Sequence, residues 1–337
     1  MFQEHIPVFY EGQDDLVDIL ATSMASVCSN TQSFIDFYIL DCGLHEVNRK
    51  LLESMKEKFK NFSIRFLPID LKRFKGLKGY GWNNFIDPYS RLLIPELVPE
   101  LNKAIYLDAD TIVVRDIKLL WDEDLNGKSI ALVADLGFKG VLKRRFIDEL
   151  GGKPGQLFMH AGVYLLDCQK WRMQKTTENL LALAKEKKEH LRIILEELFS
   201  LYFEDDYQLL DCRYGMIDSN IKTEEINADK ITPEYLENEW KHIVVMHFAG
   251  ATKPWNTCKP KFLNQSTMFF RLFWIYAQMT PYCKSMEMRM IEKLNTAQNF
   301  KHYYSFFKIP LLAIRAKKGI VTYKLFGFIP LLKRREK

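Results

Sequence analysis

The chain of 337 residues is 47% hydrophobic and 27% charged, a balance typical of a globular protein that excludes a collagen-like, low-complexity or extensively disordered chain. Its six cysteines are scattered without a CxxC pair, which favours reduced thiols over a disulfide framework or a zinc site. The net charge of +5 is uneven, because residues 301–337 carry a net +9 while residues 1–300 are mildly acidic.

Taken in chain order, the apolar segments alternate between patterns typical of strands and patterns typical of helices. Strands are expected at 6–11, 35–42, 62–69, 103–114, 129–135, 162–167 and 242–248, and helices at 15–30, 45–59, 87–101 and within 174–202. This order predicts an α/β fold with a mixed, mostly parallel sheet and flanking helices. No apolar run has the length of a transmembrane helix, and the N-terminus predicts no secretory signal.

Two acids interrupt the buried strand in "KAIYLDADTIVV", where Asp108 and Asp110 stand one residue apart. Alternate side chains of a strand share a face, so these carboxylates repel each other unless a cation or a proton lies between them. One reading is a site for a divalent cation with oxygen ligands. Another is a nucleophilic Asp108, as in phosphatases of the haloacid dehalogenase type, and a third is a turn cap beside a solvated acid.

Five separated segments stand out, namely "YSRLLIPELVP" (89–99), the acid block at 105–125, "HAGVYLLDCQKWR" (160–172), "DYQLLD" (206–211) and "HFAGATKPW" (247–255). Together and in this order they resemble glycosyltransferase family 8, whose members are retaining enzymes with the GT-A fold. The resemblance implies a Rossmann-like nucleotide-diphospho-sugar transferase fold for residues 1–265. It also implies transfer of a hexose from a UDP-sugar.

The resemblance implies a metal held by Asp108, Asp110 and His247. A ring nitrogen beside carboxylates favours Mn²⁺, with Mg²⁺ as the other candidate. The donor would contact the two acids and five further residues, Asp14, Arg91, Ala109, Gly250 and Lys253. Gly250 would let the backbone approach a phosphate and Lys253 would supply a charge for the diphosphate. For Asp14, a helix N-cap is the competing role.

The sugar-facing positions depart from the family pattern. Asp206 and Tyr207, with Gln208 one residue later, align with the segment expected near the anomeric carbon and are the catalytic candidates. His160, followed by Ala161, replaces the usual asparagine on the acceptor side. No second carboxylate is evident below the sugar, which favours a front-face route in which the departing phosphate helps to deprotonate the acceptor.

The basic C-terminal segment, residues 266–337, is expected to be a helical and amphipathic extension. Its Lys and Arg residues and interspersed apolar residues indicate binding to an anionic membrane surface and not to nucleic acid. The segment "YKLFGFIPLLKRR" (323–335) resembles the C-terminal signature of bacterial lipopolysaccharide-assembling transferases, which implies a cytoplasmic, peripheral enzyme on the inner face of a bacterial cytoplasmic membrane. Its acceptor would be a lipopolysaccharide, a lipooligosaccharide or another lipid-linked surface glycan. The alternatives are a Mg²⁺-dependent phosphohydrolase and a non-catalytic membrane-associated scaffold.

Overall fold

The computed structural model describes residues 4–81, 84–137, 140–217, 232–249, 253–256, 266–296, 299–306, 309–317, 320–325 and 329–335. The chain divides into two compact units. The first comprises Met1–Ala251 and Phe262–Pro281, and the second comprises Thr252–Lys261 and Tyr282–Lys337. The expected boundary at residue 265 differs from this division, because helix α10 (Ser266–Ala277) belongs to the first unit.

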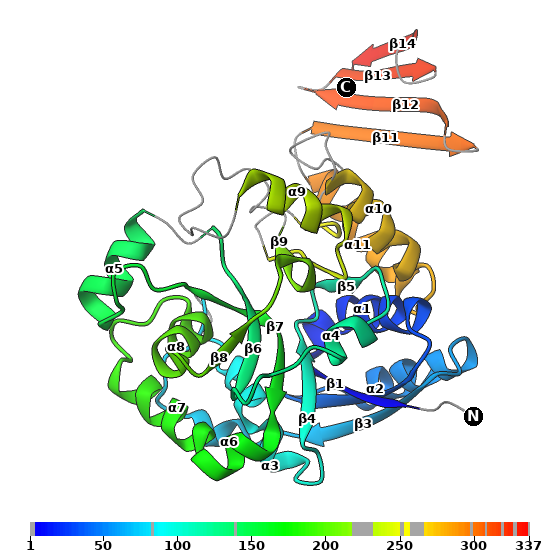
Figure 1. The fold of residues 1–337 in the computed structure, drawn as a ribbon. Coiled ribbons are helices and arrows are strands. Elements are labelled where there is room, and N and C mark those ends of the chain that lie inside the picture. The colour runs from blue at the N-terminus through cyan, green and yellow to red at the C-terminus, as the bar shows by residue number, and fades with distance from the viewer. Residues whose placement is uncertain are drawn as a thin grey trace. The chain divides into compact units, whose positions relative to one another are not determined.

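A seven-stranded sheet forms the centre of the first unit, in the order β3-β2-β1-β4-β7-β6-β8 (Figure 1). Its strands are β1 (His5–Gly12), β2 (Phe34–Asp41), β3 (Phe62–Pro68), β4 (Lys103–Leu107), β6 (Ile130–Ala134), β7 (Met159–Asp167) and β8 (Tyr207–Leu209). Only β7 runs against the other strands of this sheet. The prediction of a mixed, mostly parallel sheet is confirmed.

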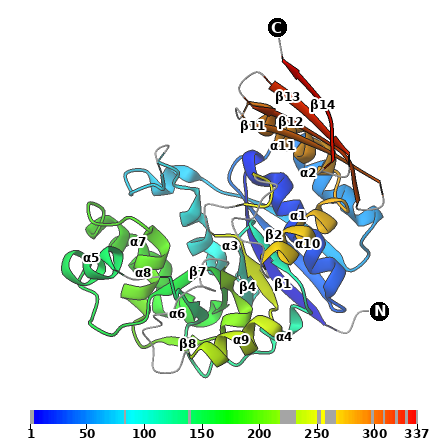
Figure 2. The ribbon, with the colours of Figure 1, turned by 90° about the horizontal axis from the view of Figure 1, so that it is seen from above.

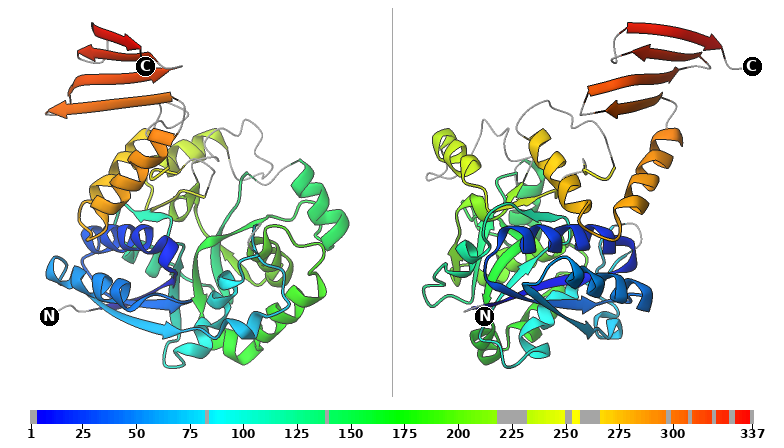
Figure 3. Two further views of the ribbon diagram at one scale, coloured as in Figure 1. Left: turned by 180° about the vertical axis from the view of Figure 1, so that it is seen from behind. Right: turned by 90° about the vertical axis from the view of Figure 1, so that its right-hand side faces the viewer.

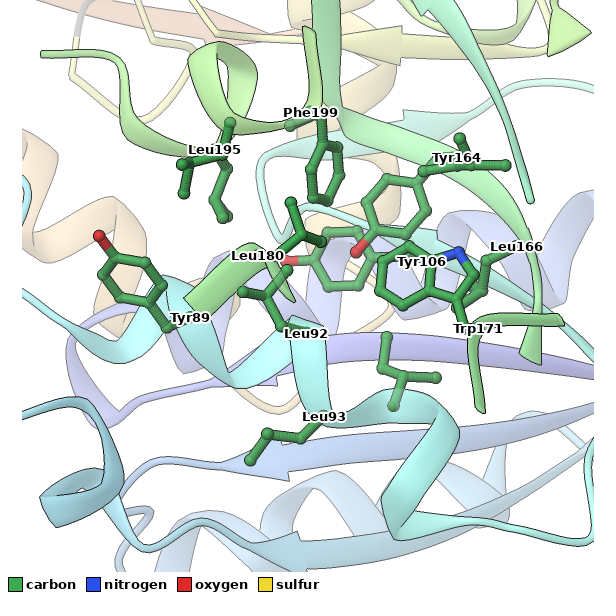
Figure 4. Close-up of a cluster of buried hydrophobic side chains, with 14 of the residues drawn as sticks. Tyr89, Leu92, Leu93, Tyr106, Tyr164, Leu166, Trp171, Leu180, Leu195 and Phe199 are labelled. Atoms are coloured by element: carbon green, nitrogen blue, oxygen red, sulfur yellow. The ribbon is translucent and has the colours of Figure 1, made fainter. Parts of the chain in front are cut away.

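Adjacent residues of β1 show that the sheet is buried on both faces. The Tyr10 hydroxyl is hydrogen-bonded at 2.8 Å to Ser23 of helix α1 (Val17–Asn30). Phe9 lies on the other face, in the core around Tyr106 and Tyr164, whose rings stack (Figure 4). Burial on both faces explains why the strand sequences are almost continuously apolar.

Helices cover both faces of this sheet. Besides α1 and α10, the helices of the first unit are α2 (Glu46–Ser54), α3 (Ile94–Leu97), α4 (Lys118–Trp121), α5 (Val141–Leu150), α6 (Cys168–Gln174), α7 (Thr176–Glu186), α8 (Ile194–Phe203) and α9 (Pro233–Lys241). Helices α1 and α10 lie side by side, and Asn30 donates a hydrogen bond to the Tyr276 hydroxyl (Figure 2). The helix expected at 87–101 is mostly a 3-10 helix, Asp87–Leu93, since Pro88 and Pro95 each remove a backbone donor.

A small second sheet, in the order β5-β10-β9, adjoins the end of β4. It consists of β5 (Thr111–Val113), β9 (Met216–Ile217) and β10 (Val245–His247). Strand β10 pairs antiparallel with β5, so that His247 is opposite Thr111. Residues far apart in the sequence thus meet directly after the acid pair.

The second unit contains helix α11 (Cys283–Thr296) and a four-stranded antiparallel sheet of consecutive strands (Figure 3). The strands are β11 (Asn299–Phe306), β12 (Ile309–Lys317), β13 (Ile320–Leu325) and β14 (Ile329–Arg335). The prediction of a helical extension is therefore wrong for 299–335. In the sequence Gly319 and Gly327 separate segments rich in β-branched and aromatic residues, which is a hairpin pattern. Within the described part of the chain, no helix is both long and apolar enough to cross a bilayer.

Candidate metal and donor site

The acid pair lies in the turn between β4 and β5. The backbone N–H of Asp108 donates to the Gly162 carbonyl of β7 at 2.8 Å, which fixes the end of β4. Thr111 donates to the Asp108 carbonyl through both its backbone N–H and its hydroxyl, and this closes the turn. Both carboxylates remain partly accessible, with about a quarter of each side chain exposed. The turn therefore presents two adjacent acids to solvent beyond the end of a strand.

His247 joins the acids from the end of β10. Its Nε2 atom lies 2.8 Å from Asp110 Oδ1 and 3.8 Å from Asp108 Oδ2. One ligand atom from each of the three side chains falls within 4.8 Å of the others. The prediction that His247 meets the acids, although 137 residues separate it from Asp110, is confirmed as geometry.

Gly162 supplies the space in which this cluster forms. A Cβ atom at this position would lie 2.3 Å from His247 Cε1 and 2.7 Å from Asp108 Oδ2. Any side chain would therefore displace a ligand. The sequence did contain a signal for this residue, because a glycine inside a buried strand often marks a close approach.

His160 also contacts the cluster, but through His247. Its Nε2 atom lies 2.6 Å from His247 Nδ1, and it is 3% exposed. Burial lowers the pKa of His160 well below its usual value, and His247 lowers it further. A neutral His160 can accept a hydrogen bond from Nδ1–H of His247, which leaves the lone pair of His247 on Nε2, the nitrogen that faces the acids.

Arg91 is the positive partner of the acid pair. Its guanidinium lies 2.9 Å from Asp108, 3.4 Å from Glu11 and 4.3 Å above the centre of the Tyr106 ring. It also donates to the Ala161 carbonyl at 3.2 Å. Burial raises the pKa of Glu11 to about 7, and Arg91 limits this rise. Arg91 thus lies beside Asp108, as the resemblance implied, while Glu11 is a member of the site that sequence reasoning missed.

Glu196 is a second carboxyl group that sequence reasoning missed. It stands on α8, and the Tyr80 hydroxyl lies 3.4 Å from its Oε2 atom. Burial raises the pKa of Glu196 to about 7; Asp108 also raises it, whereas Arg91 lowers it. Glu196 therefore belongs to the same electrostatic environment as the acid pair. Two adjacent acids, Glu196 and Glu197, in the mostly apolar helix "ILEELFSLYF" were the available signal.

The proposed catalytic segment at 206–208 lies elsewhere, and this assignment needs correction. Tyr207 and Gln208 pair with the first residues of β6, at the edge of the sheet opposite the end of β4. Asp206 is hydrogen-bonded to Ser129 and, at 2.7 Å, to Lys170. The structure does not bring this segment to the acid pair. The acid and the glutamine of this segment resemble those of the family motif, but Tyr207 and Gln208 belong to a strand, β8.

Four donor candidates remain to be described. Asp14 accepts hydrogen bonds from the His45 backbone and the Asn48 side chain near the start of α2. It is not the N-cap of a helix, because Gln13, Leu16 and His45 hold those positions. Ala109 is half-buried between the two acids. Gly250 lies outside the described residues, and Lys253 belongs to the second unit.

The donor set fits a divalent cation. Two carboxylates and one imidazole nitrogen match the ligand preferences of Mn²⁺, and the oxygens alone would also suit Mg²⁺. The lone pair of His247 faces the acids because its other nitrogen is occupied by His160. The residues thus provide three ligands and leave room for substrate oxygens.

Comparison with known proteins agrees with this geometry. The chain is 29% identical over 257 residues to glycosyltransferase GlyF of Streptococcus pneumoniae, covering 76% of this chain and 57% of GlyF. It is 26% identical to lipopolysaccharide 1,2-glucosyltransferase of Escherichia coli, covering 75% of this chain and 73% of that protein. The galactosyltransferase LgtC, solved with donor and acceptor sugar analogs, superposes with a TM-score of 0.70 at 21% identity, over 82% of this chain and 96% of LgtC.

The chain thus spans a little over half the length of GlyF, and the likeness to LgtC shows the shared GT-A fold. The family described as "Glycosyl transferase family 8" matches residues 7–259, a range that includes the acid pair, Arg91, Gly162, Glu196 and His247. The chain belongs to glycosyltransferase family 8.

Proposed function

We propose that the chain is a metal-dependent, retaining hexosyltransferase that moves galactose or glucose from a UDP-sugar to a glycan acceptor. The observation that carries this proposal is the cluster of Asp108, Asp110 and His247 in a chain of this family. The acceptor would be a lipopolysaccharide, a lipooligosaccharide or another lipid-linked surface glycan. The relative named lipopolysaccharide 1,2-glucosyltransferase supports that choice.

The residues of the site have distinct tasks in this reaction. A bound Mn²⁺ or Mg²⁺ would neutralise the charge that grows on the diphosphate leaving group. Arg91 holds Asp108 in place and adds positive charge beside the donor. Gly162 keeps the cradle open, and His160 orients the imidazole of His247.

Glu196 bears on how configuration is retained. A front-face route is favoured where no second carboxylate lies below the sugar, and Glu196, a partly buried carboxyl group in contact with Tyr80, is a candidate for such a carboxylate. Mass spectrometry of the peptide containing Glu196, after incubation with a UDP-hexose in the absence of acceptor, distinguishes the routes. A sugar ester on Glu196 would identify double displacement, whereas an unmodified peptide in an active preparation supports the front-face route.

Thermal shift and hydrolysis measurements test the function itself. We expect UDP-galactose or UDP-glucose to stabilise the protein in Mn²⁺ and to release free hexose slowly, and both effects to disappear in EDTA. Asp110→Asn should abolish the Mn²⁺ dependence, while the exposed Asp122→Asn serves as the matched control. A protein with no metal or nucleotide affinity would refute the proposal and favour the scaffold. The phosphohydrolase alternative loses its basis, because the family match explains the acid block.

We further propose that the C-terminal sheet holds the enzyme at an anionic membrane surface on the cytoplasmic side. Strand register assigns six basic residues to one face of the sheet: Lys301, Arg315, Lys317, Lys324, Lys333 and Arg335. The opposite face takes mostly apolar positions, such as Phe300, Leu312, Ile314, Val321 and Ile329. The basic face would meet the lipid headgroups, each basic residue contributing about 1 kcal/mol.

Vesicle sedimentation tests the membrane proposal with variants of equal charge. The triple variant Lys301→Gln, Arg315→Gln, Lys324→Gln removes charges from the basic face. The control variant Lys308→Gln, Lys318→Gln, Lys337→Gln removes the same charge from positions outside the described strands. We expect the first to lose most binding to vesicles containing phosphatidylglycerol and the second to lose little. Equal losses, or equal binding to neutral phosphatidylcholine vesicles, would contradict a role of the basic face.

A further inference from the structure

A cavity of about 600 Å³ lies outside the metal cluster, and its wall is rich in lysine. Its lining residues come from the segment 71–86 and from the connection between α7 and α8. Four of them are lysines, Lys72, Lys75, Lys78 and Lys188, and the one acid is Glu189. We call this cavity the lysine pocket. None of Asp108, Asp110 and His247 contributes to it.

In the described part of the chain, the four lysines of the lysine pocket have no ion-pair partner. Among the described residues, no carboxylate lies within 4.0 Å of the ammonium group of any of its four lysines, whereas neighbours in the sequence are paired. Arg73, next to Lys72, forms an ion pair with Glu96 at 2.8 Å, and Lys187, next to Lys188, forms one with Glu186 at 3.1 Å. Uncompensated cations gathered around one cavity attract an anion.

Hydrogen bonds fix the wall formed by residues 71–86. The Asp70 side chain caps the 3-10 helix Leu71–Phe74 by accepting from the Lys72 backbone N–H at 3.0 Å. The Tyr89 hydroxyl donates to the Lys78 carbonyl at 3.0 Å. Tyr80 and Phe85 form a β-bridge directly after it. Three of the four lysines, Lys72, Lys75 and Lys78, thus belong to a stretch whose described backbone is held by hydrogen bonds before any anion binds.

The lysine pocket is connected to the site through Tyr80 and Glu196. Tyr80 follows Lys78 by two residues, accepts a hydrogen bond from the Leu195 backbone N–H at 2.7 Å and reaches Glu196. The other wall, at Lys188, leads into α8, the helix that carries Glu196. Both walls of the pocket are therefore continuous in the chain with the residues of the Tyr80–Glu196 contact, although neither residue lines the pocket.

We propose that the lysine pocket binds a phosphate or carboxylate group carried by the acceptor glycan. The proposal rests on the proposed function, because only a transferase has an acceptor to place there. The ammonium groups would pair with the anionic group, and the apolar side chains of Leu71, Leu77 and Ile86 would contact the sugar ring. The enzyme would accordingly select acidic glycans over neutral ones.

Calorimetric titration of the full-length protein in EDTA tests the pocket independently of sugar transfer. Without a divalent cation the acid pair repels anions, so binding reports on the lysines. We expect glucose 6-phosphate or glucuronate to bind, glucose not to bind, and inorganic phosphate to bind about tenfold more weakly than glucose 6-phosphate. Equal binding of inorganic phosphate would refute a glycan-borne ligand, and absence of all anion binding would refute the pocket.

Matched double variants complete the test. Lys75→Gln with Lys78→Gln should weaken binding of the anionic sugar at least about tenfold. Arg73→Gln with Lys187→Gln removes the same charge from the paired neighbours and should change it less than about twofold. Equal effects of the two variants would refute the pocket, provided that circular dichroism shows both to be folded. If hexose transfer fails while this binding pattern holds, the function proposal fails and the anion site remains.

Discussion

Replacing Gly162 by alanine tests how closely the metal ligands are packed. The added Cβ would lie 2.3 Å from His247 Cε1, whereas ordinary contact begins at 3.4 Å, so the imidazole or the strand must move by about 1 Å. Metal–ligand distances tolerate only about 0.2 Å. We therefore expect Gly162→Ala to weaken Mn²⁺ affinity at least as much as loss of an outer hydrogen bond, which costs about 10- to 100-fold.

Electron paramagnetic resonance of free Mn²⁺ measures this affinity without any substrate. Gly152→Ala is the matched control, because its Cβ would come within 2.1 Å of the Phe146 ring and so introduces a similar clash away from the acids. Overpacking of this kind costs about 1–3 kcal/mol of stability in either variant. The control should nevertheless keep wild-type Mn²⁺ affinity. If folded Gly162→Ala binds Mn²⁺ within about twofold of the wild type, the reasoning about the cradle is refuted.

Three further outcomes follow from the site and its supports. His160→Leu should weaken Mn²⁺ binding about 10- to 100-fold, and His160→Gln, which keeps an acceptor, should restore much of it; equal losses would contradict the orienting role. The folded protein holds the Glu196 proton up to about pH 7, so the contribution of this group to the free energy of unfolding is lost as pH rises from about 5 to 7. Glu196→Gln should therefore make the melting temperature depend less on pH in this range. An unchanged pH dependence would contradict this reasoning. Arg145→Ala strands the fully buried Glu197 carboxylate and should cost about 3–5 kcal/mol in urea unfolding, whereas the exposed Arg144→Ala should cost little.

Sequence reasoning succeeded where one local pattern determined the structure. The apolar segments around Asp108 predicted its strand, whereas the meeting of Asp110 with His247 across 137 residues was implied by the resemblance of "HFAGATKPW" to the family motif. Sequence reasoning failed at Glu196 and at 206–208, because an acid in a helix and an acid before a strand look alike without knowledge of which edge of the sheet each approaches. Glu11 belongs to the site only through its contact with Arg91, which no spacing rule reveals, whereas Gly162 had a signal in the glycine of a buried strand.

The secondary structure of the C-terminal segment shows the same limit. The composition of 299–335 predicts an amphipathic segment, but the prediction of a helix assumed that residues on one face recur with the period of a helix. The register pairs Lys301–Arg315 and Arg315–Thr322 instead assign six of the seven Lys and Arg positions of these strands to one face of a sheet, where the period is two. The net charge of a segment does not depend on its backbone conformation, whereas the sequence spacing of residues that share a face does.

The origin of the three ligands in the chain has a consequence for assembly. Asp108 and Asp110 are available once the β4–β5 turn forms, but His247 arrives only when β10 has docked on β5. A nascent or truncated chain ending before Val245 would therefore lack the third proposed ligand, so cation loading would depend on the late strand being in place. A bound ion would in turn hold this strand to the early half of the fold. At 100 times its dissociation constant it would add about 2.7 kcal/mol to stability, so chelation should loosen β10 before it disturbs the central sheet.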